Sequence, residues 1–164
     1  MTAAGTDDLQ RPADPAVARD LCSVTFSDQP HSLVLVTRSQ RSVLEGDSEL
    51  QQLLDKLRLY QLRATLQLEG LRYGIGDFSV SVARAIQKPL EEFRGIVLDV
   101  AYHPLDSLAA ADPILQETAA VGANIRVAGA GMEGFGLPER YSLQHAAVQY
   151  VQLMVQLLGE GSKQ

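Results

Sequence analysis

Cysteine is almost absent from this sequence, because Cys22 is the only one among 164 residues. A single cysteine cannot form an intrachain disulfide or supply the several thiolates of a structural zinc site. The composition is therefore typical of a protein from a reducing, intracellular compartment. Cys22 alternates with Val24 and Phe26, a pattern that predicts a small buried side chain rather than a reactive thiol.

Basic residues are scarce as well. There are 14 Lys and Arg residues against 20 Asp and Glu residues, which gives a formal net charge of −6. No segment gathers the run of positive charge that binding to nucleic-acid phosphates requires, so the sequence argues against direct nucleic-acid binding. Long hydrophobic runs and a signal-like N-terminus are also missing, and we expect neither membrane anchoring nor secretion.

What is present is the composition of an ordinary globular protein. Hydrophobic residues make up 46% of the chain and charged residues 21%, and a chain of this length can bury one core. Residues 1–20 are rich in Ala, Asp and Pro without an apolar period, which predicts a disordered N-terminal tail. We expect a single domain over residues 21–158 and a short C-terminal tail over residues 159–164.

Alternation of apolar and polar residues predicts an antiparallel β-sheet. The alternating or apolar stretches are residues 22–26, 33–36, 43–44, 66–68, 73–75, 78–82 and 96–102. Gly70 can supply a turn, and the change of parity before Phe78 requires a bulge or a tight loop at Gly76-Asp77. A polar connection over residues 87–94 precedes the last strand, which we expect to end at His103-Pro104.

Helical spacing predicts the remaining elements. Asp47 or Ser48 can cap a helix, with Gln51 three residues after Ser48 as in a capping box. Its apolar positions lie on one face and predict a helix that packs on the core: Leu50, Leu53, Leu54, Leu57 and Tyr60 or Gln61. A second helix is expected within residues 105–121, where Asp112-Pro113 is a typical helix start.

The last helix is expected from Ser142 to about Leu158, after a glycine-rich loop over residues 123–138. Its apolar arc is wider than the ~100° stripe of a helix packed on one side. Two explanations of this wide arc are open: the sheet encloses the helix, or the helix packs on both the core and a neighbouring subunit. The predicted fold class is α+β, with an antiparallel sheet or barrel-like sheet and two to three packed helices.

The residues alone reveal no active site. Residues 129–134 match G-x-G-x-x-G, but Gly136 and Pro138 prevent the glycines from opening the helix that a dinucleotide site needs. The three histidines lie in different predicted elements, and no G-x-S-x-G elbow is present. Aromatic residues are the candidate anchors for a partner, although most suit a core: Tyr60, Tyr73, Phe93, Tyr102, Phe135, Tyr141 and Tyr150.

Four spaced segments make the sequence recognisable. They are RSQRSVLE at residues 38–45, RYGIGDF at 72–78, RGIVLDVAY at 94–102 and YSLQHAAVQY at 141–150. In this order they resemble the family of subunit 20 of the Mediator complex of RNA polymerase II transcription, in its plant-type versions. The resemblance covers about residues 33–158. Relatives carry a further helix and strand near the N-terminus, and residues 1–20 predict no counterpart, which would leave a sheet edge open.

The resemblance implies a β-barrel-like fold, a nuclear location, and a non-catalytic coactivator subunit without a cofactor, metal or small-molecule substrate. It implies a heterodimer with Mediator subunit 18 in the head module, joined through subunit 8, with no direct contact to nucleic acid or membrane. The candidate interface or family-motif residues are Arg72, Tyr73, Asp77, Phe78, Tyr102, Tyr150 and Met154. The alternative is a small ligand-binding barrel or an enzyme that uses a cavity inside the sheet. An apolar, filled interior favours the Mediator subunit, and an open pocket with converging polar groups favours the alternative.

Overall fold

The computed structural model describes residues 21–57, 62–104 and 132–159. These residues form two three-stranded antiparallel sheets and two helices, which confirms the predicted α+β class. The first sheet contains β1 (Leu21–Phe26), β2 (Gln29–Thr37) and β3 (Ser42–Asp47). The second sheet contains β4 (Thr65–Ile75), β5 (Phe78–Lys88) and β6 (Glu92–Tyr102). The helices are α1 (Ser48–Leu57) and α3 (Leu143–Gly159).

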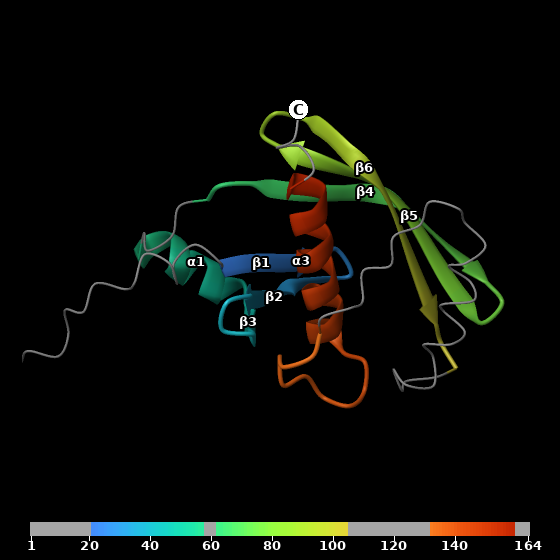
Figure 1. The fold of residues 1–164 in the computed structure, drawn as a ribbon, viewed down its shortest axis with the longest axis horizontal. Helices are drawn as coiled ribbons and strands as arrows, with labels where there is room; N and C mark the ends of the chain where they lie inside the picture. The colour runs from blue at the N-terminus through green and yellow to red at the C-terminus, as the bar shows by residue number, and fades with distance from the viewer. Residues whose placement is uncertain (1–20, 58–61, 105–131, 160–164) are drawn as a thin grey trace, which may run out of the picture.

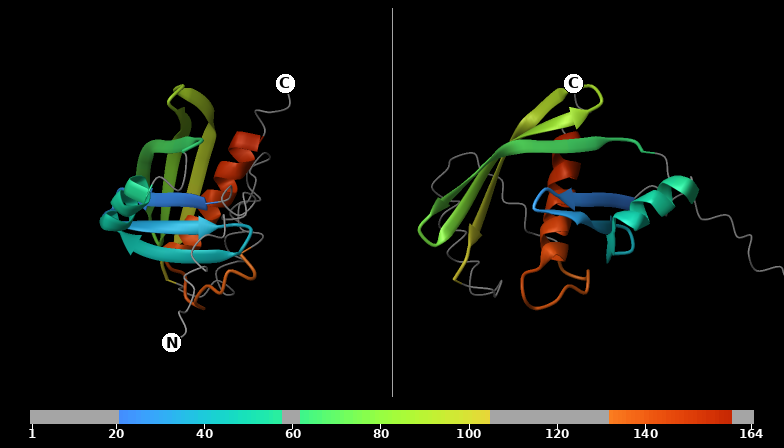
Figure 2. Two further views of the ribbon diagram at one scale, coloured as in Figure 1. Left: turned by 90° about the vertical axis from the view of Figure 1, so that its left-hand side faces the viewer. Right: turned by 180° about the vertical axis from the view of Figure 1, so that it is seen from behind.

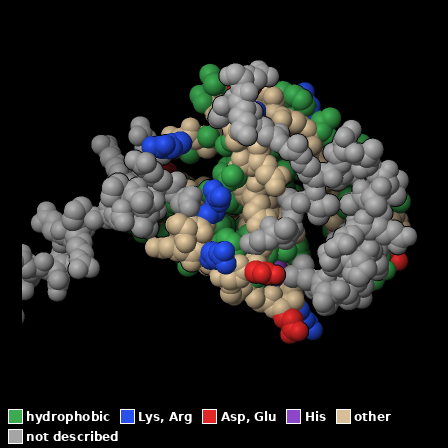
Figure 3. Space-filling view, viewed as in Figure 1, with side chains coloured by type: hydrophobic (Ala, Val, Ile, Leu, Met, Phe, Trp, Pro, Cys, Tyr) green, Lys and Arg blue, Asp and Glu red, His purple; other side chains and the backbone are tan. Residues whose placement is uncertain are grey.

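The elements are arranged in layers, with α3 between the two sheets (Figure 1). The view from behind shows the second sheet on one side of α3 and the first sheet with α1 on the other (Figure 2). In the same orientation as Figure 1, hydrophobic side chains reach the surface along the upper end of the second sheet (Figure 3). The described strands form two separate open sheets and do not close into the barrel that the resemblance implied.

The central strand of the first sheet is buried on both faces. Leu33 and Leu35 point to the side covered by α1, and Val34 and Val36 point to α3. A strand with two covered faces reads as a continuous apolar run rather than an alternation. The more continuously apolar stretch at residues 33–36 was therefore a correct sign of a buried strand.

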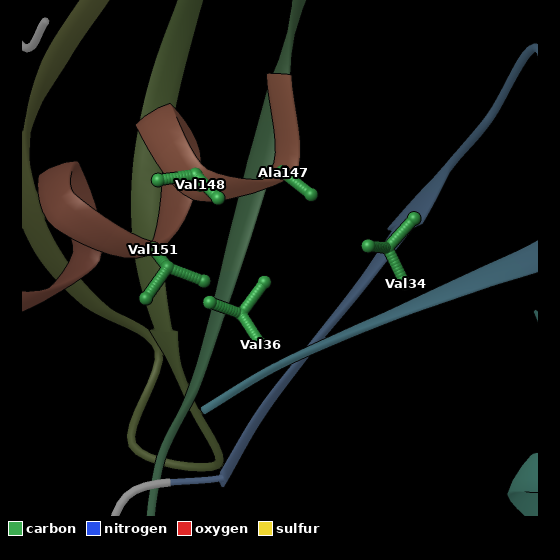
Figure 4. Close-up of a cluster of buried hydrophobic side chains, with 5 residues drawn as sticks. All are labelled: Val34, Val36, Ala147, Val148 and Val151. Carbon is green, nitrogen blue, oxygen red and sulfur yellow. The ribbon is translucent and has the colours of Figure 1, made fainter. Parts of the chain in front are cut away.

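A core of aliphatic side chains joins the first sheet to α3 (Figure 4). Val34 and Val36 meet Ala147, Val148 and Val151, and all five are at most 2% exposed. Cys22, Val24 and Phe26 from β1 pack against this cluster. Cys22 therefore faces the core as predicted, although it is partly rather than fully buried. Of the two alternatives for the last helix, its place between the sheets favours enclosure.

The start of α3 is fixed by a reciprocal pair of contacts. The backbone N–H groups of His145 and Ala146 donate to the Ser142 carbonyl at 3.0 and 3.2 Å. In return, the Ser142 N–H donates to Nδ1 of His145 at 3.1 Å. His145 thus takes the part that Glu or Gln has in a capping box, while Oγ of Ser142 lies 2.9 Å from the same Nδ1. His145, which is 2% exposed, therefore has a structural role at the helix start.

The predicted packing of α1 is partly wrong. Asp47 is the cap, since its Oδ1 accepts the N–H groups of Glu49 and Leu50 at 3.0 and 3.2 Å. However, none of the ten residues of α1 is buried, and Leu53 and Leu57 are each 51% exposed. The helix covers β2 and β3 from the outside, where no further described layer encloses its apolar stripe.

The second sheet is a meander of three eleven-residue strands. Gly76 and Asp77 form the two-residue turn between β4 and β5, as expected, with Gly76 at φ +59°. The predicted turn at Gly70 is wrong, because β4 runs through it. A Cβ at Gly70 would lie 2.0 Å from the main-chain oxygen of Val82, so the glycine permits a close approach of backbones.

The predicted connection over residues 87–94 is shorter in the structure. Strand β5 continues to Lys88 and β6 begins at Glu92. Strands of an antiparallel sheet can carry polar side chains where they meet solvent, so polar residues alone did not mark a loop. The last strand ends before His103-Pro104, as predicted. Several predictions lie outside the described residues: both chain ends, Tyr60, the helix within residues 105–121 and the glycine-rich loop before Met132.

Candidate partner-binding surface

The second sheet has two faces of opposite character. Cross-strand pairs assign ten residues to the same face: Leu71, Tyr73 and Ile75 from β4, Phe78, Val80 and Val82 from β5, and Ile96, Leu98, Val100 and Tyr102 from β6. We call these ten residues the outer face. The other parity, the inner face, meets α3 at Gly95 and Asp99. The apolar side of the sheet therefore points away from the helix.

The outer face is open to solvent along much of its length. Leu71 is 65% exposed, Ile75 62%, Ile96 70% and Leu98 45%. At the other end of β5 and β6, the rings of Phe78 and Tyr102 pack with centroids 4.8 Å apart. Single exposed apolar residues are normal on protein surfaces, but a continuous apolar sheet face marks an interaction site.

Three of the predicted interface residues belong to this face: Tyr73, Phe78 and Tyr102. Sequence reasoning missed its most exposed members, Leu71 and Ile96. The predicted stretch at residues 96–102 contains Ile96, but Leu71 falls between the stretches at 66–68 and 73–75, next to the turn expected at Gly70. The sequence feature that could have revealed this face is a run of apolar residues at every second position in each of β4, β5 and β6. The sequence did not indicate that this parity turns outward.

Three other predicted residues, Arg72, Tyr150 and Met154, lie on the inner parity of the second sheet or on α3. Tyr150 packs edge-on against Phe26 of β1, with ring centroids 5.8 Å apart. Its hydroxyl donates to Oδ2 of Asp99 on β6 at 3.3 Å, so one side chain links both sheets. Met154 is half-buried one turn later on α3.

Arg72 lies on the inner parity of β4 and makes two polar contacts. Its Nε donates to Oγ of Ser81 at 3.1 Å, and its guanidinium lies 3.7 Å from the carboxylate of Asp28 in the first sheet's β1–β2 turn. Asp77 is exposed in its turn, and its main-chain carbonyl accepts the N–H of His103 at 3.0 Å. The structure therefore separates the predicted residues into an aromatic group on the outer face (Tyr73, Phe78 and Tyr102), two residues that contact both sheets (Arg72 and Tyr150), the half-buried Met154 on α3, and Asp77 in its exposed turn.

The environment of α3 shifts three protonation equilibria. Burial, with the nearby Asp99 carboxylate, raises the pKa of Tyr141 to about 12. Burial, followed by the charge of Asp99, also raises the pKa of Tyr150. Burial lowers the pKa of His145, although a hydrogen bond to the Pro138 carbonyl opposes the shift. All three groups are held in their neutral forms, which suits a structural region.

The described residues offer little that suits the binding of a small molecule or a metal ion. A pocket of about 200 Å³ between the first sheet and α3 is lined by Val36, Arg38, Arg41, Phe135, Val148, Val151 and Gln152. This volume is below the range of about 300–1,000 Å³ for small-molecule sites. A second hollow of about 610 Å³ lies along α1 and is lined only by Asp47 and side chains of that helix, so it is a depression on the outside of one helix rather than a site where several elements converge. Across residues 21–57, 62–104 and 132–159, no three His, Cys, Asp or Glu side chains converge as a metal ligand set. No helix in this part of the chain has the length and hydropathy needed to cross a membrane.

An α+β domain with an apolar sheet face turned to solvent is typical of proteins that act by assembling with other proteins. The sequence comparisons agree with this class. Residues 2–155 match the family described as the TATA-binding related factor (TRF) of subunit 20 of Mediator complex. The chain belongs to this family, which confirms the resemblance and makes it a subunit of the Mediator type in RNA polymerase II transcription.

Two relatives have the same family name. The chain is 29% identical over 150 residues to Mediator of RNA polymerase II transcription subunit 20b from Arabidopsis thaliana. That alignment covers 85% of this chain and 68% of the relative. It is 29% identical over 84 residues to the subunit 20 of Schizosaccharomyces pombe, covering 51% of this chain and 42% of that relative.

Proposed function

We propose that this chain is a non-catalytic subunit of the Mediator coactivator that works in the nucleus through contacts with other proteins. The observation that carries the proposal is the apolar outer face of the second sheet. A contiguous apolar face open to solvent is typical of a protein–protein interface, and an assembly subunit covers such a face with its partner. The net charge of −6 supports a role through proteins rather than through contacts to DNA phosphates.

The proposed partner is Mediator subunit 18, in a heterodimer within the head module that is joined to the rest through subunit 8. Tyr73, Phe78 and Tyr102 are the proposed partner contacts among the family-motif residues, because their side chains belong to the outer face. Arg72 and Tyr150 are proposed to act indirectly, since each contacts both sheets. Met154 is proposed to act indirectly through the packing of α3, on which it is half-buried.

The proposal is tested by affinity purification of the tagged full-length chain from nuclear extract of its own organism. Mass spectrometry is expected to identify subunits 18 and 8 and further Mediator subunits in stoichiometric amounts. Co-expression with subunit 18 is expected to give a 1:1 complex in gel filtration with light scattering. A chain that remains monomeric in both experiments and retains no Mediator subunit contradicts the proposal.

A further inference from the structure

The second sheet presents its larger side chains away from the helix it packs on. On β5, the inner parity consists of Ser79, Ser81, Ala83 and Ala85, and the outer parity begins with Phe78, Val80 and Val82. In an antiparallel sheet with one covered face, the apolar parity normally points to the core and the polar parity to water. Here the order is reversed, so the outer face is suited to a second contact.

The inner face explains how the reversal is tolerated. Ala85 and Val97 are buried there, and the Cβ position of Gly95 lies only 3.3 Å from Leu157 on α3. Small residues let the helix approach the sheet closely, and a pairing shifted by one residue would force the bulky parity against α3. The packing of α3 therefore fixes the apolar parity on the outside.

The exposed area is large enough for a stable interface. Six of the ten outer-face residues are more than 40% exposed: Leu71, Tyr73, Ile75, Val82, Ile96 and Leu98. Each presents on the order of 100 Å², which gives about 600 Å² in total. A standard interface buries about 800 Å² on each partner, and the largest patch on a typical monomer is about 300–600 Å².

We propose that the outer face is the surface that docks a second folded protein chain, whose matching surface is a broad apolar face without charge at its centre. This inference rests on the proposed function, because it assigns a surface to the proposed heterodimer. Docking covers the exposed members around Leu71 and Ile96 and packs against the ring pair of Phe78 and Tyr102.

Charge and shape select this occupant. Glu69 and Arg84 share the outer parity, and the Arg84 guanidinium lies 3.6 Å from the Glu69 carboxylate, beside the apolar residues. The two charges neutralise each other, so a partner needs no charged group to match them. A second copy of the chain would bring together two molecules of net charge −6, which repel each other. An extended peptide binds to a strand edge through its backbone, whereas the outer face offers side chains over three strands.

The test measures the affinity of full-length variants for subunit 18. Ile96→Glu introduces a charge at the most exposed position of the outer face, and Leu53→Glu makes the same kind of change on α1 as the matched control. Ile96→Glu is expected to weaken binding about 30-fold or more, as for the loss of a hot-spot contact. Leu53→Glu is expected to change it less than about threefold, and both variants are expected to melt as the wild type does.

A second measurement remains informative if a variant folds poorly. A photo-reactive amino acid at position 96 of the full-length chain is expected to cross-link to subunit 18, and one at position 53 is not. A cross-link from position 96 to a second copy, or to another part of the same chain, overturns the inference. Wild-type binding that Ile96→Glu leaves unchanged overturns it while the proposed function stands. Failure of the wild-type chain to bind subunit 18 overturns both.

Discussion

The two sheets of this protein differ in how their faces are covered. The first sheet lies between α1 and α3, and its central strand contains four consecutive buried residues from Leu33 to Val36. The second sheet meets α3 with one face only and leaves apolar residues such as Ile96 in solvent. The first sheet is therefore enclosed by helices of the same chain, whereas the outer face of the second sheet is left for the partner that we propose.

The largest effect is expected from the helix that both sheets share. Met154 and Leu157 are half-buried on α3, and Leu157 lies against Gly95 of the second sheet. Replacing both with Ala should lower the free energy of unfolding by about 4 kcal/mol, out of a total of about 5–15 kcal/mol for a domain. Urea denaturation measures this, with the exposed Gln156→Ala as control. A double variant with wild-type stability would show that α3 does not join the sheets.

Close packing within the second sheet is tested by two glycines of the same strand. Gly70→Ala places a methyl group against the main-chain oxygen of Val82, whereas a Cβ at Gly74 meets nothing within 4 Å. We expect Gly70→Ala to cost about 3 kcal/mol and Gly74→Ala less than about 0.5 kcal/mol. Thermal melts compare the two, and equal melting temperatures would contradict the close approach at Gly70.

The comparison between the sheets is tested directly by the same substitution in each. Val36 is fully buried in the first sheet, and Val82 on the outer face is 41% exposed. Val36→Ala should cost about 2 kcal/mol through lost burial and a small cavity, and Val82→Ala less than about 0.5 kcal/mol. If Val82→Ala in the isolated chain were as costly as Val36→Ala, the outer face would be part of the chain's own core.

The link between the sheets is tested at Tyr150. Tyr150→Phe removes the hydroxyl that donates to Asp99 and should cost about 1 kcal/mol, whereas Tyr73→Phe on the outer face should be neutral. Because the folded pKa of Tyr150 is raised, the wild type should lose stability as the pH rises above about 10, the pKa of tyrosine in an unfolded chain. Tyr150→Phe should flatten that alkaline loss, and an unchanged pH profile would argue against the link.

The smallest effect concerns the first turn of α3. The folded pKa of His145 is lowered, so its contribution is complete above the unfolded histidine pKa of about 6.5 and is lost as the pH falls below it. His145→Gln keeps an acceptor for the Ser142 N–H, as in a normal capping box, and removes the titration. Melting temperatures at pH 8 and pH 5.5 should therefore differ less in this variant than in the wild type. The exposed His103→Gln is the control and should retain the full difference.

Local sequence determined the elements of this protein. Alternation identified the strands, the helical spacing of apolar residues after Ser142 identified the last helix, and the four ordered motifs identified the family. These features depend on backbone geometry and neighbouring side chains, which a sequence pattern records directly.

Only the tertiary structure decided what each face meets. Alternation shows that Phe78, Val80 and Val82 share a face, but both parities of a strand are equally available to the core until a helix packs on one of them. The same limit explains the exposed Leu53 on α1, the strand-interior role of Gly70, and the division of the predicted site into Tyr73 outside and Tyr150 inside. Burial depends on contacts between segments far apart in the chain, and no local pattern contains them.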